Sequence, residues 1–254
     1  MKFEQLDRRM RVFETAHDHR VLPGVHMVAR IDGRSFSQLT RVDLGLSRAY
    51  DARMRDAMIV ASRRVMSCGF AAIYGYTQSD EINVLFRRDE EAFGRKLRKF
   101  LSVLAAEASV AFSMHLGSPG AFDCRISQLP RDEDVVDYFR WRQEDAHRNA
   151  LNAHCYWLHR DRGLDDAAAT RALLGVSVAE RNELLFASGL NFNDLPSWER
   201  RGIGFYYATK PSVGTDPRTG AAVESTVREL VTDLELPMRA DYDAFIRRFV
   251  VEQR

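Results

Sequence analysis

Between residues 25 and 126 the hydrophobic positions change repeatedly between a strand-like and a helix-like spacing. Short apolar runs predict strands at residues 25–31, 72–77, 82–86 and 122–126. Apolar residues that recur every three or four positions predict helices at residues 47–68 and 90–114. The order strand, helix, strand, strand, helix, strand is that of a ferredoxin-like arrangement, so we expect an α/β (α+β) protein with a βαββαβ core.

The remaining parts of the chain predict further helices and one more hairpin. Residues 3–16 form a charged amphipathic helix that we expect to cap the core, with contact to a partner subunit as the alternative. A long helix is expected at residues 132–161, with Val136, Phe139 and Ala146 facing inward and Trp141, Arg142, Asp145 and His147 on its other faces. Later elements are helices at residues 164–174, 177–186 and 241–251 and a hairpin formed by residues 203–209 and 224–236.

The predicted hairpin at residues 72–86 carries two adjacent carboxylates at its turn. Aromatic and β-branched residues flank Gln78-Ser79-Asp80-Glu81 on both sides. Neighbouring strand residues point to opposite faces, so Asp80 and Glu81 are expected to differ in role, one facing a ligand and the other bracing it or lying in solvent. An acidic turn considered alone is usually only a solvated turn.

A second acidic position ends the first predicted strand, at Asp32-Gly33. In a ferredoxin-like core the first strand lies antiparallel to the third, which brings Asp32 close to Asp80 and Glu81. Carboxylate oxygens with few histidines or thiols nearby suit Mg²⁺, which shares its remaining positions with water and substrate phosphates. We therefore expect a nucleoside triphosphate as the partner of three converging carboxylates.

Five segments, in this order along the chain, resemble the tRNA-His guanylyltransferase family, and most closely its bacterial and archaeal guanylyltransferase-like members, which polymerise in the 3′-to-5′ direction. The resemblance runs from about residue 2 to about residue 206, and the segments are Ala29 to Phe36, Tyr74 to Glu81, Phe122 to Arg125, Trp141 to Asn149, and Arg181 to Phe186.

The resemblance implies a palm-like catalytic core at residues 1–130, similar to nucleotide polymerases, and a helical and β-hairpin part at residues 131–254 that packs on it and contacts RNA. It further implies template-dependent nucleotide addition to the 5′ end of tRNA, as in tRNA 5′-end repair, with two Mg²⁺ ions and with ATP, GTP or other triphosphates as substrates. Its partners would be the 5′ end and acceptor stem of tRNA, and family members are homotetramers built as dimers of dimers.

The family's motifs also imply roles for individual residues. Asp32 and Asp80 would hold the two ions with the Gly33 carbonyl, and Glu81 would orient the site or join it part of the time. Nucleotide would be bound by Arg34, Ser35, Phe36, Ser37 and Ser79. Activation and RNA phosphate contacts would come from Arg30, Arg95, Lys96, Arg98, Lys99, Arg125, His147, Asn149, Arg181 and Asn182.

One predicted basic surface and two departures from the family pattern affect these roles. Arg95, Arg98 and Lys99 fall on one face of the helix at residues 90–114, within reach of a bound triphosphate or else merely solvated. Residues 38–46 lack the lysine of eukaryotic relatives, for which only Arg41 could substitute in charge, and Arg181 replaces another family lysine.

Composition limits the partners, the metal sites and the cellular location that can be expected. The 254 residues are 45% hydrophobic with a net charge of +1, so a nucleic-acid surface must come from local clustering of charge. Three widely spaced cysteines argue against a disulfide framework or a zinc site, and no signal or membrane segment is recognisable, so we expect a cytoplasmic protein. Two other functions stay open: a nucleotidyl cyclase-like palm enzyme, whose Gly-Gly-Asp/Glu-Glu-Phe signature is absent, and a non-catalytic RNA-binding module.

Overall fold

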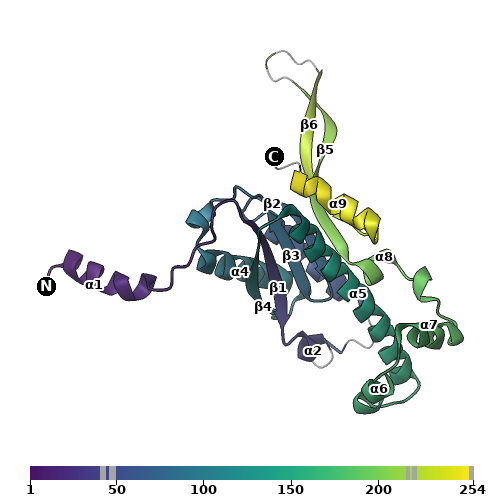
Figure 1. Cartoon of the computed structure of the whole chain (residues 1–254). Coiled ribbons are helices and arrows are strands. Elements are labelled where there is room, and N and C mark those ends of the chain that lie inside the picture. Colours follow the sequence, from purple (N-terminus) through teal and green to yellow (C-terminus); the bar gives the residue numbers. More distant parts are fainter. Residues whose placement is uncertain (41–43, 46–49, 216–217, 219–221, 252–254) are drawn as a thin grey trace.

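The computed structural model describes residues 1–40, 44–45, 50–215, 218 and 222–251, so Arg41 lies outside the described residues. Its centre is a six-stranded antiparallel sheet in the order β4-β1-β3-β2-β5-β6 (Figure 1). The order β4-β1-β3-β2 confirms the predicted ferredoxin-like core. The strands are β1 His26–Arg34, β2 Ala72–Gln78, β3 Glu81–Phe86, β4 Ala121–Leu129, β5 Ile203–Thr215 and β6 Ala222–Asp233.

Helices cover both faces of this sheet, because its inner strands alternate between two apolar cores. Met27, Ala29 and Ile31 of β1 pack into the core beneath α3 (Ala52–Met66) and α4 (Leu97–Leu116). Val28 belongs to the second core, beneath α5 (Asp132–Asp161) and α9 (Ala240–Val251). Arg30, two residues after Val28, therefore lies on the α5 face.

The predicted helix at residues 47–68 is shorter than expected and begins at Ala52. Asp51 stops it at the N-terminal end, where its side chain accepts a hydrogen bond of 2.8 Å from the Arg53 main-chain N–H. Tyr50, which the helical spacing had placed on the same face, has a positive φ of 57° and packs into a third core instead.

A second correction concerns the helix predicted at residues 90–114. Residues 92–95 form a 3-10 turn (η2, Ala92–Arg95) in which Phe93, Gly94 and Arg95 have positive φ, and α4 starts only at Leu97. Arg95 is 2% exposed, and its guanidinium donates to five main-chain carbonyl oxygens, those of Val21, Leu22, Val25, Arg88 and Glu90. The predicted exposed basic face is therefore wrong for Arg95, which instead anchors the segment before β1.

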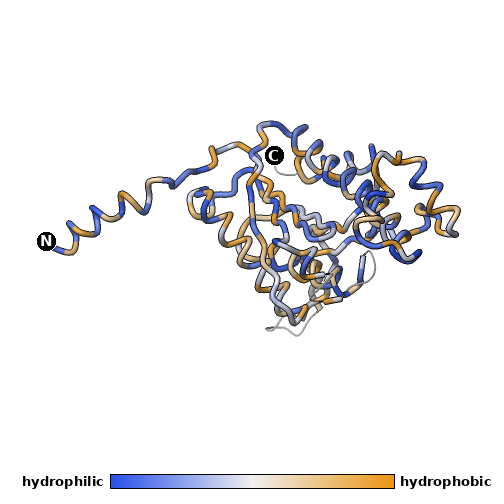
Figure 2. Tube along the Cα trace, turned by 90° about the horizontal axis from the view of Figure 1, so that it is seen from below, coloured by the Kyte–Doolittle hydropathy of each residue, from blue (hydrophilic) through white to orange (hydrophobic). Residues whose placement is uncertain are grey.

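The N-terminal helix α1 (Phe3–Thr15) does not cap the core, contrary to expectation. It points away from the rest of the protein and buries no residue (Figures 1 and 2). Its predicted apolar stripe stays in solvent, with exposed fractions of 39% at Leu6, 50% at Met10 and 71% at Phe13.

The C-terminal elements agree with the prediction in kind, but the hairpin predicted at residues 203–209 and 224–236 has other bounds, because β5 continues to Thr215 and β6 ends at Asp233. The hairpin β5–β6 pairs with the core through Thr77 opposite Ile203, so it continues the sheet and then extends beyond it (Figure 1). No helix among the described residues is long and apolar enough to cross a membrane. The short elements are α2 Phe36–Gln38, α6 Asp166–Ala172, α7 Val178–Ala187, η3 Phe192–Asp194 and α8 Ser197–Arg201.

Candidate active site

The end of β1 and the turn between β2 and β3 lie side by side, as predicted. Asp32 is the direct neighbour of Glu81 across the two strands, and the Gly33 N–H donates to the Asp80 carbonyl oxygen at 3.0 Å. A methyl group on Gly33 would sit 2.6 Å from the Phe36 ring and 2.9 Å from the Asp80 Cβ atom. Glycine is therefore required here because the two segments approach so closely.

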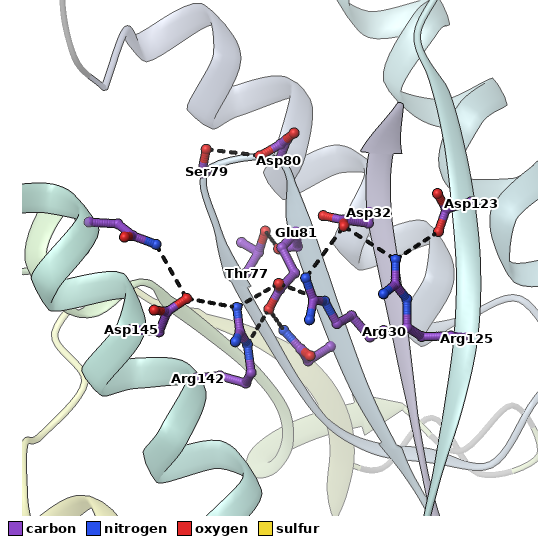
Figure 3. A network of polar contacts seen from close by, with 12 residues as sticks. Arg30, Asp32, Thr77, Ser79, Asp80, Glu81, Asp123, Arg125, Arg142 and Asp145 are labelled. Carbon is purple, nitrogen blue, oxygen red and sulfur yellow. Dashed lines mark hydrogen bonds and ion pairs between the residues drawn. The ribbon is translucent and has the colours of Figure 1, made fainter. Parts of the chain in front are cut away.

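Asp80 occupies the tip of the turn, and its polar side-chain partner among the described residues is Ser79, whose hydroxyl donates to it at 3.0 Å (Figure 3). Burial raises the pKa of the Asp80 carboxyl, and the neighbouring negative charges of Asp32 and Glu81 raise this pKa further. The turn therefore concentrates negative charge that a bound cation would stabilise.

Glu81 points away from Asp80 and toward α5, so the expected convergence of three carboxylates is wrong in this respect. Arg142 donates to both of its oxygens, each at 2.7 Å, while Arg30 lies 2.8 Å and the Asn83 amide 2.8 Å away (Figure 3). Arg142 is only 8% exposed, although the helical spacing had placed it on an outward face.

Asp32 lies between two arginines that approach it only loosely. One of its oxygens is 3.4 Å from Arg30 and 3.6 Å from Arg125, which also reaches Asp123 at 3.4 Å. Within the described part of the chain, no three carboxylate, imidazole or thiol groups gather around one point. The carboxylates of Asp32 and Asp80 nevertheless fit Mg²⁺, because this ion is usually held by one or two carboxylates and completes its shell with water and substrate phosphates.

A cavity of about 450 Å³ is lined by Asp32, Asp80, Glu81, Arg30 and Arg142, and this size is within the usual range for small-molecule sites. Its far wall is aromatic: the Tyr50 ring stacks on His154 at 5.6 Å and meets the edge of Trp198 at 6.0 Å, and the Arg55 guanidinium lies 5.0 Å from the Trp198 ring. Trp157, Met54 and Met58 extend this wall.

Several predicted nucleotide- and RNA-binding residues lie in or beside this cavity. Ser37, Ser79, Arg30 and Asn149 line it. Ser35 has a positive φ of 61° just after β1, and the Phe36 side chain is buried between Phe112 and Phe122, so only the main chain of Phe36 could meet a ligand. Arg34 is exposed at the end of β1.

The structure brings other predicted residues to different places. His147 lines a separate cavity of about 390 Å³ with Trp141 and Arg239, and burial lowers the pKa of its imidazole. Arg181 donates to the Leu173 carbonyl oxygen at 3.1 Å, and Asn182 donates to that of Val178 at 2.8 Å, both in the α6–α7 region.

Lys96 and Arg98 form ion pairs with Asp18 at 2.8 and 2.6 Å, and Lys99 lies 5.5 Å from the Phe93 ring. They follow the far end of β3, whose six residues carry the chain roughly 15 Å away from Glu81. The prediction that this basic face contacts a triphosphate at Asp32 and Asp80 of the same chain is therefore wrong, whereas RNA contact by Lys96, Arg98 and Lys99 stays a prediction.

Comparison with known proteins agrees with this geometry. A family model described as tRNAHis guanylyltransferase (Thg1) matches residues 7–130, and the model described as the Thg1 C terminal domain matches residues 133–235. A probable tRNA(His) guanylyltransferase of Drosophila melanogaster is 32% identical over 195 residues, which are 73% of this chain and 68% of that protein. The chain belongs to the tRNA(His) guanylyltransferase family. The expected family is confirmed and with it the enzyme class, a nucleotidyltransferase.

Other members of the guanylyltransferase family differ in how much of their length this chain covers. A probable tRNA(His) guanylyltransferase of Dictyostelium discoideum is 30% identical, with 79% of this chain and 81% of that protein aligned. The chain spans 64% of the length of a mouse relative at 30% identity.

Solved structures share the fold. A bacterial guanylyltransferase-like protein in complex with ATP superposes with a TM-score of 0.77 at 24% identity, covering 96% of this chain and 98% of that one. The same kind of bacterial protein in complex with GTP gives a TM-score of 0.73 at 24% identity.

Part of this site could not be read from the sequence. Tyr50 and Trp198 come from segments far from Trp157 of α5 in the sequence and share no motif with it, and only the packing of α5 and α8 beside the hairpin turn brings the three rings to this cavity. An aromatic residue with a positive φ just before a helix, like Tyr50, leaves no spacing signal.

Proposed function

We propose that this protein adds nucleotides to the 5′ end of tRNA in the 3′-to-5′ direction, templated by the opposite strand, with nucleoside triphosphates as substrates. The observation that carries the proposal is the pairing of β1 with β3, which brings Asp32 and Asp80 to one end of a cavity that can contain a nucleotide. Membership of the guanylyltransferase family supports the same reaction. No observation favours the cyclase or the RNA-binding module instead.

Each group at the cavity has its own role in this proposed reaction. Asp32, Asp80 and the Gly33 carbonyl would hold two Mg²⁺ ions, whose chemistry there would be to lower the pKa of an attacking hydroxyl and to neutralise charge on the leaving pyrophosphate. Ser79 and Ser37 line the side of the cavity where the phosphates would lie. The ring of Tyr50 and the indoles of Trp157 and Trp198 offer apolar faces to the base.

Activation of a 5′-monophosphate would precede the addition, with ATP or GTP as the donor. Arg125 and Arg30 are the cations nearest to Asp32 in the described part of the chain and would meet the phosphates on this side. Arginine binds phosphate through a planar fork of N–H donors, so it positions the group as well as neutralising it.

The test is incubation of the protein with a 5′-truncated tRNA, labelled triphosphates and Mg²⁺. We expect template-directed extension of the 5′ end, and a loss of several kcal/mol of transition-state stabilisation, a factor of about 10³ or more, in Asp32→Ala and Asp80→Ala. Asp123→Ala is the matched control, because its carboxylate lies opposite Asp32 on β4 and contacts Arg125 but not the cavity. Near-normal extension by either cavity variant would contradict the metal assignment.

The assembly and location of the protein are part of the same proposal. We propose a homotetramer in the cytoplasm, and the exposed apolar side chains of α1 support contact with another subunit. Light scattering behind a sizing column should give four times the mass of 29.1 kDa. Phe13→Ser should lower that mass if α1 takes part in assembly, and a monomeric wild-type protein would contradict this arrangement.

A further inference from the structure

Glu81 has no free oxygen, although it follows Asp80 directly in the chain and lies opposite Asp32 on the neighbouring strand. One oxygen accepts from Arg142 and Asn83, and the other accepts from Arg142 and faces Arg30. Both carboxylate oxygens are thus used within the protein. Glu81 differs in this from Asp80, whose polar side-chain contact is the Ser79 hydroxyl.

Arg142 comes from a different part of the chain and is itself held in place. It lies on α5, 61 residues after Glu81, and donates to Asp145 at 3.3 Å as well as to Glu81. Asp145 in turn accepts from Arg148 at 2.5 Å and from Asn149 at 3.3 Å. Figure 3 shows this row of contacts running from α5 through Glu81 to Arg30 and Asp32.

The consequence for Asp32 comes through Arg30. The Arg30 guanidinium bridges two carboxylates, at 2.8 Å from Glu81 and 3.4 Å from Asp32. While Arg142 satisfies Glu81 bidentately, Arg30 can stay in this intermediate position. Without Arg142, Glu81 would no longer be held toward α5, and Arg30 would be the remaining cation beside a buried carboxylate. Arg30 would then follow Glu81 and leave its position beside Asp32, so the orientation of the Asp32 carboxylate would no longer be fixed.

We propose that Arg142 is a positioning residue of the metal site, which by binding both Glu81 oxygens fixes Arg30 beside Asp32 and so holds the Asp32 carboxylate in place for a metal ion. The inference rests on the proposed function only in taking Asp32 and Asp80 as metal ligands. It gives the long helix of the C-terminal part a direct role in shaping the carboxylate site of the N-terminal part.

Metal binding by the protein without nucleotide or RNA distinguishes a positioning role of Arg142 from the effect of its positive charge alone. Removal of a nearby positive charge would by itself tighten the binding of a cation. Loss of a positioning group weakens it, typically 10- to 100-fold when a residue behind the ligands is removed. The sign of the change therefore decides between the two.

The experiment is a titration of the nucleotide-free protein with Mn²⁺, followed by the electron paramagnetic resonance signal of the free ion. We expect Arg142→Met to bind Mn²⁺ about 10- to 100-fold more weakly than the wild type. Arg142→Lys keeps the charge but cannot grip both oxygens, so it should also bind more weakly, and it serves as the test if Arg142→Met does not fold.

The control is Arg140→Met. Arg140 lies on the same helix and also grips a carboxylate bidentately, that of Asp243 at 2.8 and 2.7 Å, but it joins α5 to α9 away from the carboxylate site. Its loss should lower the melting temperature and leave Mn²⁺ affinity unchanged. A further variant combines Arg142→Met with Glu81→Gln. If Arg142 acts through Glu81, this double variant should bind Mn²⁺ no more weakly than Glu81→Gln alone.

The inference would be overturned if both Arg142 variants bound Mn²⁺ as tightly as the wild type or more tightly. It would also be overturned if the changes in Mn²⁺ affinity caused by Arg142→Met and by Glu81→Gln were additive in the double variant. A wild-type protein whose Mn²⁺ binding does not depend on Asp32, tested with Asp32→Asn, would overturn it as well. Because no RNA is used, a protein that binds Mn²⁺ as expected but does not extend tRNA would contradict the proposed reaction and leave the role of Arg142 intact.

Discussion

Replacement of Arg95 by methionine should destabilise the protein more than the loss of any exposed arginine. The Arg95 side chain donates to five main-chain carbonyl oxygens at distances of 2.7 to 3.3 Å and is 2% exposed. A methionine would leave these carbonyls without a donor in a site closed to water. We expect a loss of about 3–5 kcal/mol, because a buried group left without a partner costs about 1–3 kcal/mol and several carbonyls lose their donor together.

The assay is thermal unfolding, in which 1 kcal/mol corresponds to about 2–4 °C for a chain of this size, so the melting temperature should fall by roughly 6–20 °C. Arg98→Met is the matched control, because its side chain is 47% exposed and pairs with Asp18, a contact worth about 1 kcal/mol at most. A melting temperature of Arg95→Met within about 2 °C of the wild type would refute the assignment of Arg95 as the anchor of the segment before β1.

Four further outcomes are expected. Gly33→Ala should lower the free energy of unfolding by about 1–3 kcal/mol, because its new methyl group overlaps the Phe36 ring, and should slow nucleotide addition at least tenfold. Normal activity would show that the reaction does not require Asp80 to lie this close to residue 33. Asp80→Asn should raise the melting temperature of the metal-free protein at pH 7, because a carboxyl whose pKa is raised on folding destabilises the protein as the pH rises through that pKa. The gain in melting temperature should vanish below about pH 4, where the carboxyl is protonated in both the folded and the unfolded protein. No gain at any pH would show that folding does not raise the pKa of this carboxyl. The protein should extend a tRNA with a 5′-triphosphate faster than one with a 5′-monophosphate, and Arg181→Lys should reduce this difference in rate if the family position serves activation. Equal single-turnover rates on the two tRNAs would show that the missing lysines do not affect activation. Neutralising Arg98 and Lys99 together should reduce the salt dependence of tRNA binding by roughly one counterion for each RNA phosphate that these side chains neutralise, and an unchanged slope would assign both residues to solvent.

The strands and the site carboxylates could be predicted because their signals are local. Alternation in residues 72–86 marks the hairpin, and the position of Asp32 at the end of its strand needs only the topology of the core to place it near Asp80. The helix at residues 132–161 was predicted with the bounds that the structure gives. In each case the deciding information lies within one element and its neighbours.

The roles of the arginines could not be predicted in this way. Arg95 and Arg142 have the spacing of an exposed helical face, but their partners lie elsewhere in the chain: carbonyls near residue 22 for Arg95 and the Glu81 carboxylate for Arg142. A charged side chain becomes a buried one only when a distant group satisfies it. Sequence spacing does not record that partner, so both were placed on the surface.

The attachment of β5 to β2 has a consequence for the synthesis of this chain. Thr77 pairs with Ile203, a residue made 126 positions later, so at 5–20 residues per second the free edge of β2 waits roughly 6 to 25 seconds for its neighbour. During this time the edge exposes unpaired main-chain groups next to Tyr74 and Tyr76, which are fully buried in the finished protein. Another nascent chain could pair there, so the ribosome-bound intermediate exposes an edge through which this protein can aggregate.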